Sequence, residues 1–207
     1  YPLLLQMPRQ TLLLHRNRSK SCISLARHCS SAAALAVSAL RANGRPARSR
    51  CGFGTYFAPD KAIDHWVVEV WSSDRWRMVD FQIDDFQRAE LGLDFDTLDM
   101  PSGKFLLAAQ AWQLCRRGEG DPYRFGIFDE GGFWFIASNM IRDLASLNKV
   151  EMLPWDDWGA MPSPDAVIGP EELRSVSQAS MPAGAPLAFH PRTAPVEARF
   201  FTVEADR

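Results

Sequence analysis

Three residues of this chain have the types needed for a nucleophile, a base and an orienting acid: Cys29, His65 and Asp80. Cys29 stands at the start of an alanine-rich apolar run, and a helix N-terminus favours the thiolate form of a cysteine through its unpaired N–H groups and its dipole. His65 opens a strand-like segment, and Asp80 closes the next one. This combination predicts attack of a cysteine on a carbonyl carbon, with the aspartate orienting the imidazole.

The spacing of His65 and Asp80 fits a hairpin that turns at Ser73 and Asp74. A two-residue turn there places Asp80 opposite Val67, and His65 shares the face of Val67 because it lies two residues away. The two Cα atoms on this diagonal are then about 7–8 Å apart, which lets the side chains meet. An odd-length loop would break the register, so the prediction depends on the turn.

Two other acids are alternatives for the orienting role. Asp64 precedes His65, so its side chain should point to the opposite face of the strand, whereas Glu69 shares the face of His65. Each predicted site residue also has a purely structural interpretation. Cys29 could be a small apolar residue inside a helix, and the histidine and aspartate could be polar residues on a half-exposed strand.

The composition is that of a globular protein. The chain has 207 residues, 46% hydrophobic content and seven tryptophans, enough for one sizeable core. Residues 1–50 carry nine Lys and Arg and no acid. This segment could be transit-like, a basic face for an anionic partner, or poor sequence at a fragment end, and we expect the last. The leucine runs at 3–5 and 12–14 are too short to span a bilayer, so no membrane contact is expected.

Metal and cofactor motifs are absent from the sequence. The cysteines, none of them in a CxxC pair, are Cys22, Cys29, Cys51 and Cys115. Without a clear secretory signal, we expect reduced thiols and a cytoplasmic location. A zinc site would combine His28 and Cys29 with a distant cysteine, and the acids within 84–99 lack the glycine and final glutamate of an EF-hand loop. With no GxGxxG, P-loop or HExxH motif, we expect no cofactor and no metal.

Apolar patterns predict an α+β domain over residues 26–160, between an irregular basic segment at 1–25 and a loosely packed Pro/Ala-rich tail at 161–207. The first helix should end before Gly44 and be buried on most sides. The expected elements are a helix at 27–41, a hairpin at 65–71 and 75–82, a loop region at 84–102, a helix at 104–117, a second hairpin at 125–128 and 133–136, and a helix at 138–150.

Four segments, RANGRPAR, RCGFGTYF, DHWVVEVW and RWRMVD, resemble bacterial proteins with a transglutaminase-like domain. In that family a nucleophilic cysteine precedes a buried helix and lies fifteen residues before the glycine of an R-x-x-G-I-P-A-R type turn. Cys29 lies fifteen residues before Gly44. The family's histidine and aspartate motifs match His65 and Asp80. The resemblance implies a papain-like core, with the nucleophile helix packed on an antiparallel sheet and a Cys29–His65–Asp80 triad.

The resemblance further implies a peptide or amide substrate and an acyl-enzyme, with hydrolysis expected rather than cross-linking. The family usually carries Arg-Asp-Phe or Arg-His-Phe after the cysteine, where this chain has Ser30, Ser31 and Ala32. A catalytically inactive binding module is therefore the alternative. Nucleic-acid binding by the basic residues within 9–50 is a third interpretation, but the chain lacks an aromatic-basic RNA motif and we expect no such partner. The sequence leaves the oligomeric state open.

Overall fold

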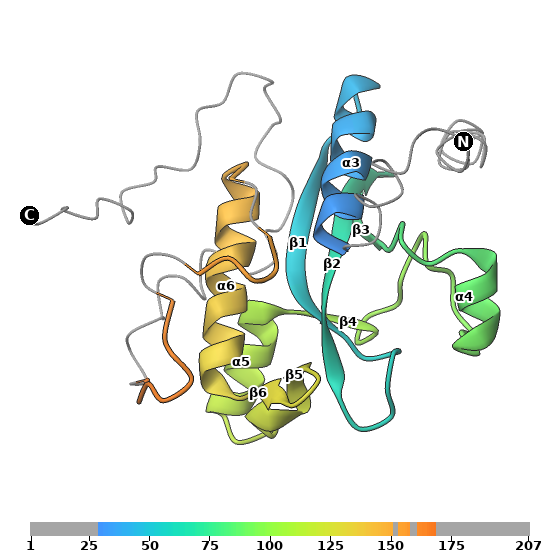
Figure 1. Cartoon of the computed structure of the whole chain (residues 1–207). Helices are drawn as coiled ribbons and strands as arrows, with labels where there is room; N and C mark the ends of the chain where they lie inside the picture. The colour runs from blue at the N-terminus through green and yellow to red at the C-terminus, as the bar shows by residue number, and fades with distance from the viewer. Residues whose placement is uncertain (1–28, 151–152, 158–160, 169–207) are drawn as a thin grey trace, which may run out of the picture.

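The computed structural model describes residues 29–150, 153–157 and 161–168 (Figure 1). The loose packing predicted for residues 1–25 and for most of the tail falls outside these residues. The elements, in chain order, are α3 (Cys29–Ala42), β1 (Ala47–Gly54), β2 (Ala62–Ser72), β3 (Arg75–Val79), α4 (Asp85–Glu90), β4 (Phe105–Leu107), α5 (Ala108–Arg116), the 3-10 turn η2 (Pro122–Arg124), β5 (Phe125–Ile127), β6 (Glu130–Gly131) and α6 (Phe133–Leu147).

A sheet forms the centre of the described fold. Its strand order is β4-β1-β2-β5-β6, and β3 pairs with the later part of β2. The pairs are antiparallel, except that the start of β2 runs parallel to β5. The predicted α+β class is confirmed, and the sheet is mixed rather than wholly antiparallel because β5 reaches β2 through a long crossover that includes α5.

Helix α3 lies against β1 and β2 (Figure 1). Its buried positions recur every three or four residues, at Ser30, Ala33, Val37 and Leu40. This is a single buried stripe, and Leu35 is 48% exposed. The prediction of a helix buried on most sides was wrong, because alanine fits both faces and hides the pattern. The helix ends where predicted: Gly44 has φ +71°, and its N–H bonds to the Arg41 carbonyl at 3.0 Å.

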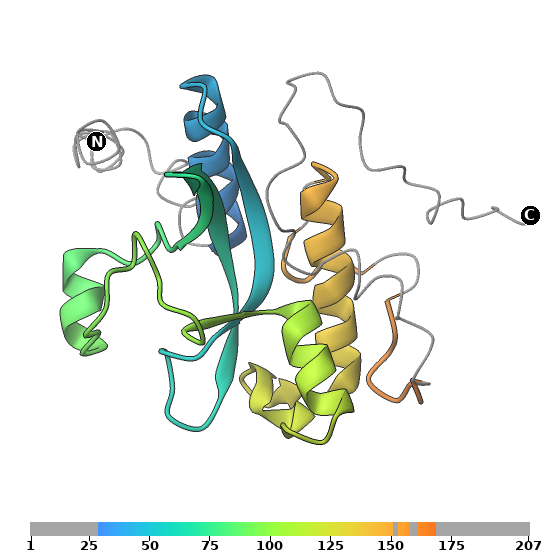
Figure 2. The same cartoon turned by 180° about the vertical axis from the view of Figure 1, so that it is seen from behind.

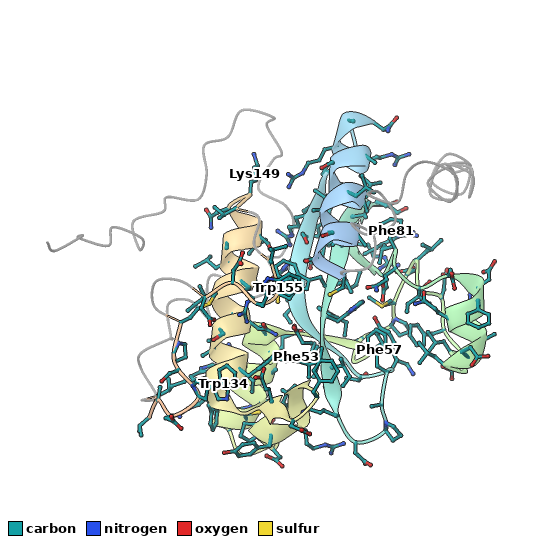
Figure 3. All side chains as sticks on the ribbon, viewed as in Figure 1. Phe53, Phe57, Phe81, Trp134, Lys149 and Trp155 are labelled. Atoms are coloured by element: carbon teal, nitrogen blue, oxygen red, sulfur yellow. The ribbon has the colours of Figure 1, made fainter. Side chains whose placement is uncertain are left out.

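Helices α5 and α6 pack together beside β1, around a cluster that contains Phe53 (Figure 3). The helix predicted from residue 104 begins only at Ala108, because the three preceding residues pair with β1 as strand β4. The strand predicted at 133–136 is wrong, since these residues form the first turn of α6. Gly132, with φ +110°, ends the short strand β6 there.

Helix α4 lies within the segment predicted as loop. Asp84 accepts a hydrogen bond from the Gln87 N–H at 2.8 Å, and the Gln87 side chain accepts one from the Asp84 N–H at 3.1 Å. This capping box was readable in the sequence as Asp-x-x-Gln. Seen from behind, α4 stands on the flank of the molecule opposite α6 (Figure 2).

A buried cluster of charges joins the sheet to α6. Arg50 of β1 is fully buried and donates two hydrogen bonds to Asp143 of α6, at 3.0 and 2.8 Å, and one to Glu69 of β2 at 2.8 Å. Asp143 also accepts the Cys51 N–H at 2.8 Å, and Arg48 forms a second ion pair with Glu69. Burial alone would lower the pKa of Arg50, but the two acids outweigh it and raise the pKa. All of these charges are therefore compensated.

Replacing Asp143 by Asn removes a charge that faces Arg50 and keeps the size of the side chain. We expect the free energy of unfolding to fall by about 3–5 kcal/mol, because breaking a buried ion pair leaves an uncompensated charge. Chemical denaturation followed by circular dichroism measures this. Asp129→Asn, at an exposed turn position, is the control and should change stability by less than about 0.5 kcal/mol. Equal effects in the two variants would contradict the assigned role of Asp143.

Candidate active site

The β2–β3 hairpin brings His65 and Asp80 together. Its two turn residues, 73–74, have φ values of 53° and 60°, as a two-residue type I′ turn requires. The register pairs Val68 with Val79, which is the register that the even turn predicts. If this register continues by one residue, Asp80 lies opposite Val67 and therefore diagonal to His65. His65 Nε2 lies 2.8 Å from Asp80 Oδ2, and both side chains are buried.

Asp80 accepts hydrogen bonds from three separate segments. Besides the His65 ring, the Tyr56 hydroxyl donates to Oδ2 at 2.6 Å and the Gln82 N–H donates to Oδ1 at 2.9 Å. The Asp80 N–H is itself bonded to the Thr97 carbonyl at 2.8 Å. Burial would raise the pKa of Asp80, but the hydrogen bonds and the attraction of His65 outweigh it and lower the pKa. The carboxylate is therefore ionised at neutral pH.

Two aromatic rings pack against the imidazole of His65. The Phe57 ring meets it edge to face with centroids 4.8 Å apart, and the Tyr56 ring does so at 6.3 Å; Figure 3 labels Phe57. Tyr56 also packs against Phe95 at 5.5 Å. Neither role was predicted from the sequence, since no spacing rule leads from Tyr56 to an aspartate 24 residues later. The GFGTYF segment was the available signal.

Cys29 is the first residue of α3 and is half-buried. Burial alone would lower the pKa of His65, but the interactions of the ring with Asp80 and Cys29 outweigh it and raise the pKa to about 10. The His65 imidazole therefore interacts with both the carboxylate of Asp80 and the thiol of Cys29.

The two alternative acids have other partners. Asp64 accepts a hydrogen bond from Asn139 of α6 at 2.8 Å, and burial raises the pKa of Asp64. Glu69 is held by Arg48 and Arg50. Burial would raise the pKa of Glu69, but these two guanidinium groups outweigh it and lower the pKa. In the described part of the chain, neither acid is hydrogen-bonded to the imidazole.

Within the described ranges, no group of three or more His, Cys, Asp or Glu side chains is arranged to hold a metal ion. Cys22 and His28, which the zinc alternative would need, lie outside those ranges. The helices of the described part are also too short or too polar to cross a membrane.

Cys29, His65 and Asp80 come from one continuous stretch of the chain. The family model of the transglutaminase-like superfamily matches residues 21–81, which include all three. This part of the chain is transglutaminase-like. This superfamily generally performs cysteine-dependent acyl transfer on a papain-like fold, in agreement with the α+β core of the described residues. Searches of curated proteins and of solved structures gave no significant match.

Replacing Tyr56 by Phe keeps the ring and removes the hydroxyl that donates to Asp80. We expect the free energy of unfolding at pH 7 to fall by about 1.5–3 kcal/mol, the contribution of a hydrogen bond to a charged group. Because the pKa of Asp80 is lowered in the folded protein, its charge stabilises the fold at any pH above the pKa of the unfolded chain. This stabilisation is lost as pH falls. The difference from the parent should therefore shrink in denaturation experiments below about pH 4.

Tyr123→Phe is the control for this variant, because Tyr123 is 73% exposed and its loss should leave stability unchanged at every pH. A Tyr56→Phe penalty that persisted undiminished in acid would mean that the hydroxyl acts through packing and not through the charge of Asp80.

The raised pKa of His65 gives stability a second pH dependence. Protonation of His65 stabilises the fold fully at any pH below the pKa of the unfolded chain, which is about 6.5. This stabilisation is lost as pH rises through the pKa of the folded protein, about 10. We expect stability to decline between pH 7 and 10 more steeply in the parent than in His65→Gln, by up to about 1.4 kcal/mol per pH unit. Denaturation at one-unit pH steps measures both slopes. Equal slopes would show that the ring does not keep its proton.

Proposed function

We propose that this transglutaminase-like domain is a cysteine enzyme that hydrolyses amide bonds through an acyl-enzyme. Cys29 is the nucleophile, His65 the general base and acid, and Asp80 the group that orients and charges the imidazole. The observation that carries the proposal is the buried hydrogen bond between Asp80 and His65, whose imidazole also interacts with Cys29. The Asp80 carboxylate is buried, ionised and held by Tyr56 and Gln82.

The first half of the reaction forms a thioester. Protonated His65 favours the thiolate of Cys29 electrostatically, and the sulfur attacks the carbonyl carbon of the amide. The backbone N–H of Cys29, at the start of α3, stabilises the negative charge that develops on the carbonyl oxygen. The C–N bond then breaks, and the imidazolium gives its proton to the leaving amine.

The second half releases the acid. The neutral imidazole of His65 takes a proton from water, whose oxygen attacks the thioester carbonyl, and the C–S bond breaks. This yields the carboxylic acid product and restores the protonated imidazole beside the Cys29 thiolate. Water is the proposed acceptor because Cys29 is only half-buried, so solvent can reach the thioester; an amine in the same place would give a new amide.

The second candidate function is an inactive binding module. Its support is the run of Ser30, Ser31 and Ala32 after the cysteine, where the family usually has Arg-Asp-Phe or Arg-His-Phe. In that case Cys29 should behave as an ordinary thiol, and His65 and Asp80 would serve only the stability of the hairpin.

Alkylation by iodoacetamide at pH 7, mapped to each cysteine by mass spectrometry, tests the proposal. We expect Cys29 to react at least about tenfold faster than the buried Cys115. Asp80→Asn should slow the Cys29 reaction by about tenfold or more in a folded protein, since an amide cannot balance the imidazolium charge and can hold the wrong tautomer. In a serine triad the equivalent change lowers turnover about 10⁴-fold.

The control for this variant is Asp60→Asn, which removes a carboxylate at an exposed position and should leave the rate unchanged. Parent-like labelling of Cys29 in a well-folded Asp80→Asn variant would remove Asp80 from the site. Release of amine from a panel of acetylated peptide amides then separates the enzyme from the binding module.

A further inference from the structure

A pocket of about 200 Å³ lies between α3 and the far end of α6. Two of its lining residues are sequence neighbours of the proposed catalytic pair: Ser30 follows Cys29, and Trp66 follows His65. The lining continues along α3 and includes Lys149, which Figure 3 shows at the end of α6. We call this space the α3–α6 pocket.

Two residues that line the α3–α6 pocket each carry an unpaired polar atom. Ser30 Oγ and Trp66 Nε1 belong to residues that are 7% and 4% exposed, and neither atom has a hydrogen-bond partner within the described residues. Buried polar atoms are nearly always paired. An indole N–H can only donate, and a hydroxyl can donate as well. This end of the pocket therefore suits a ligand that brings hydrogen-bond acceptors such as carbonyl oxygens.

The other end of the pocket is positively charged. Arg41 and Lys149 line it, and neither forms an ion pair within the described ranges. Arg41 Nε donates to the Ala47 carbonyl at 2.8 Å, so the guanidinium is held in position. The one acid of the lining, Asp156, already accepts the Leu153 N–H at 2.8 Å. The charge balance at this end favours a negatively charged group.

The distance between the two ends of the pocket sets the length of a ligand that can reach both. Ser30 and Arg41 are eleven residues apart on α3, which corresponds to about 16 Å along the helix axis. An extended peptide advances about 3.3–3.6 Å per residue, so about four or five residues would connect the unpaired donors to the cations. The small volume of the pocket allows a narrow strand of small residues rather than a bulky cofactor.

We propose that the α3–α6 pocket binds the last few residues of a peptide that ends in a free carboxylate. Its carbonyl oxygens accept hydrogen bonds from Ser30 and Trp66, and its carboxylate lies at the Arg41–Lys149 end. Resting on the proposed function, this segment is the leaving-group side of the amide attacked by Cys29. The substrates are then peptides cut a few residues before their C-terminus.

The binding half of this proposal is tested without chemistry, in Cys29→Ala protein with ¹⁵N-labelled tryptophan. The probes are acetyl-tetraalanine with a free carboxylate and the same peptide as its C-terminal amide. The Trp66 indole resonance, assigned from a Trp66→Phe spectrum, should shift with both probes, and the acid should bind about fivefold more tightly because of its charge. Ser30→Ala should weaken both probes by a similar factor, and thermal melting checks that this variant is folded.

Charge variants test the carboxylate end. Lys149→Gln should reduce the preference for the acid to less than about twofold. Arg88→Gln, which removes one positive charge from α4 on the opposite flank (Figure 2), should leave the preference intact. Equal binding of acid and amide by the parent, or a Trp66 resonance that neither probe moves, would overturn the peptide site. Tighter binding of inorganic phosphate than of the acid would also overturn it.

Protection of Cys29 tests the link to catalysis. In the parent protein, saturating acetyl-tetraalanine should slow alkylation of Cys29 by iodoacetamide at least threefold. Binding without protection would overturn the assignment of the pocket to the substrate and leave the peptide site standing. Protection of a cysteine that reacts no faster than Cys115 would support the peptide site and count against the proposed enzyme.

Discussion

The buried guanidinium of Arg50 is the contact on which the arrangement of helix and sheet depends. It is compensated by Asp143 of α6, so any displacement of that helix would leave a positive charge in a region that water does not reach. One turn earlier on the same helix, Asn139 holds Asp64, the residue directly before the site histidine. Helix α6 therefore fixes strands β1 and β2 at two positions without contributing a proposed catalytic group.

The candidate active site also depends on one buried charge, which here is negative. Asp80 is a buried anion whose donors come from the loop after β1, from β2 and from the chain after β3. Because three segments converge on one carboxylate, the loop that carries Tyr56 and Phe57 is tied to the hairpin that carries His65. The packing of these rings and the charge of the imidazole are thus set by the same small group of contacts.

The sequence was sufficient to predict a contact or a helix end where residue type and strand or helix periodicity indicate the same structure. Strand alternation and an even turn at 73–74 determine the pairing of His65 with Asp80, and the helix stop at Gly44 follows from its left-handed backbone. It was insufficient where the course of a loop decides the contact, as for the Tyr56 hydroxyl. The apolar FWFI segment fits a strand as well as a buried helix, so the start of α6 at Phe133 could not be derived from its pattern.

The His65–Asp80 and Arg50–Asp143 ion pairs also differ in how much chain each one closes. His65 and Asp80 are 15 residues apart, whereas Arg50 and Asp143 are 93 apart. The entropic cost of closing a loop rises with its length, and contacts between near neighbours in sequence form readily. The hairpin of the site can therefore assemble early, while the Arg50–Asp143 contact completes the domain. An interaction that forms after the folding transition state changes the unfolding rate more than the folding rate, so we expect loss of the Arg50–Asp143 contact mainly to speed unfolding.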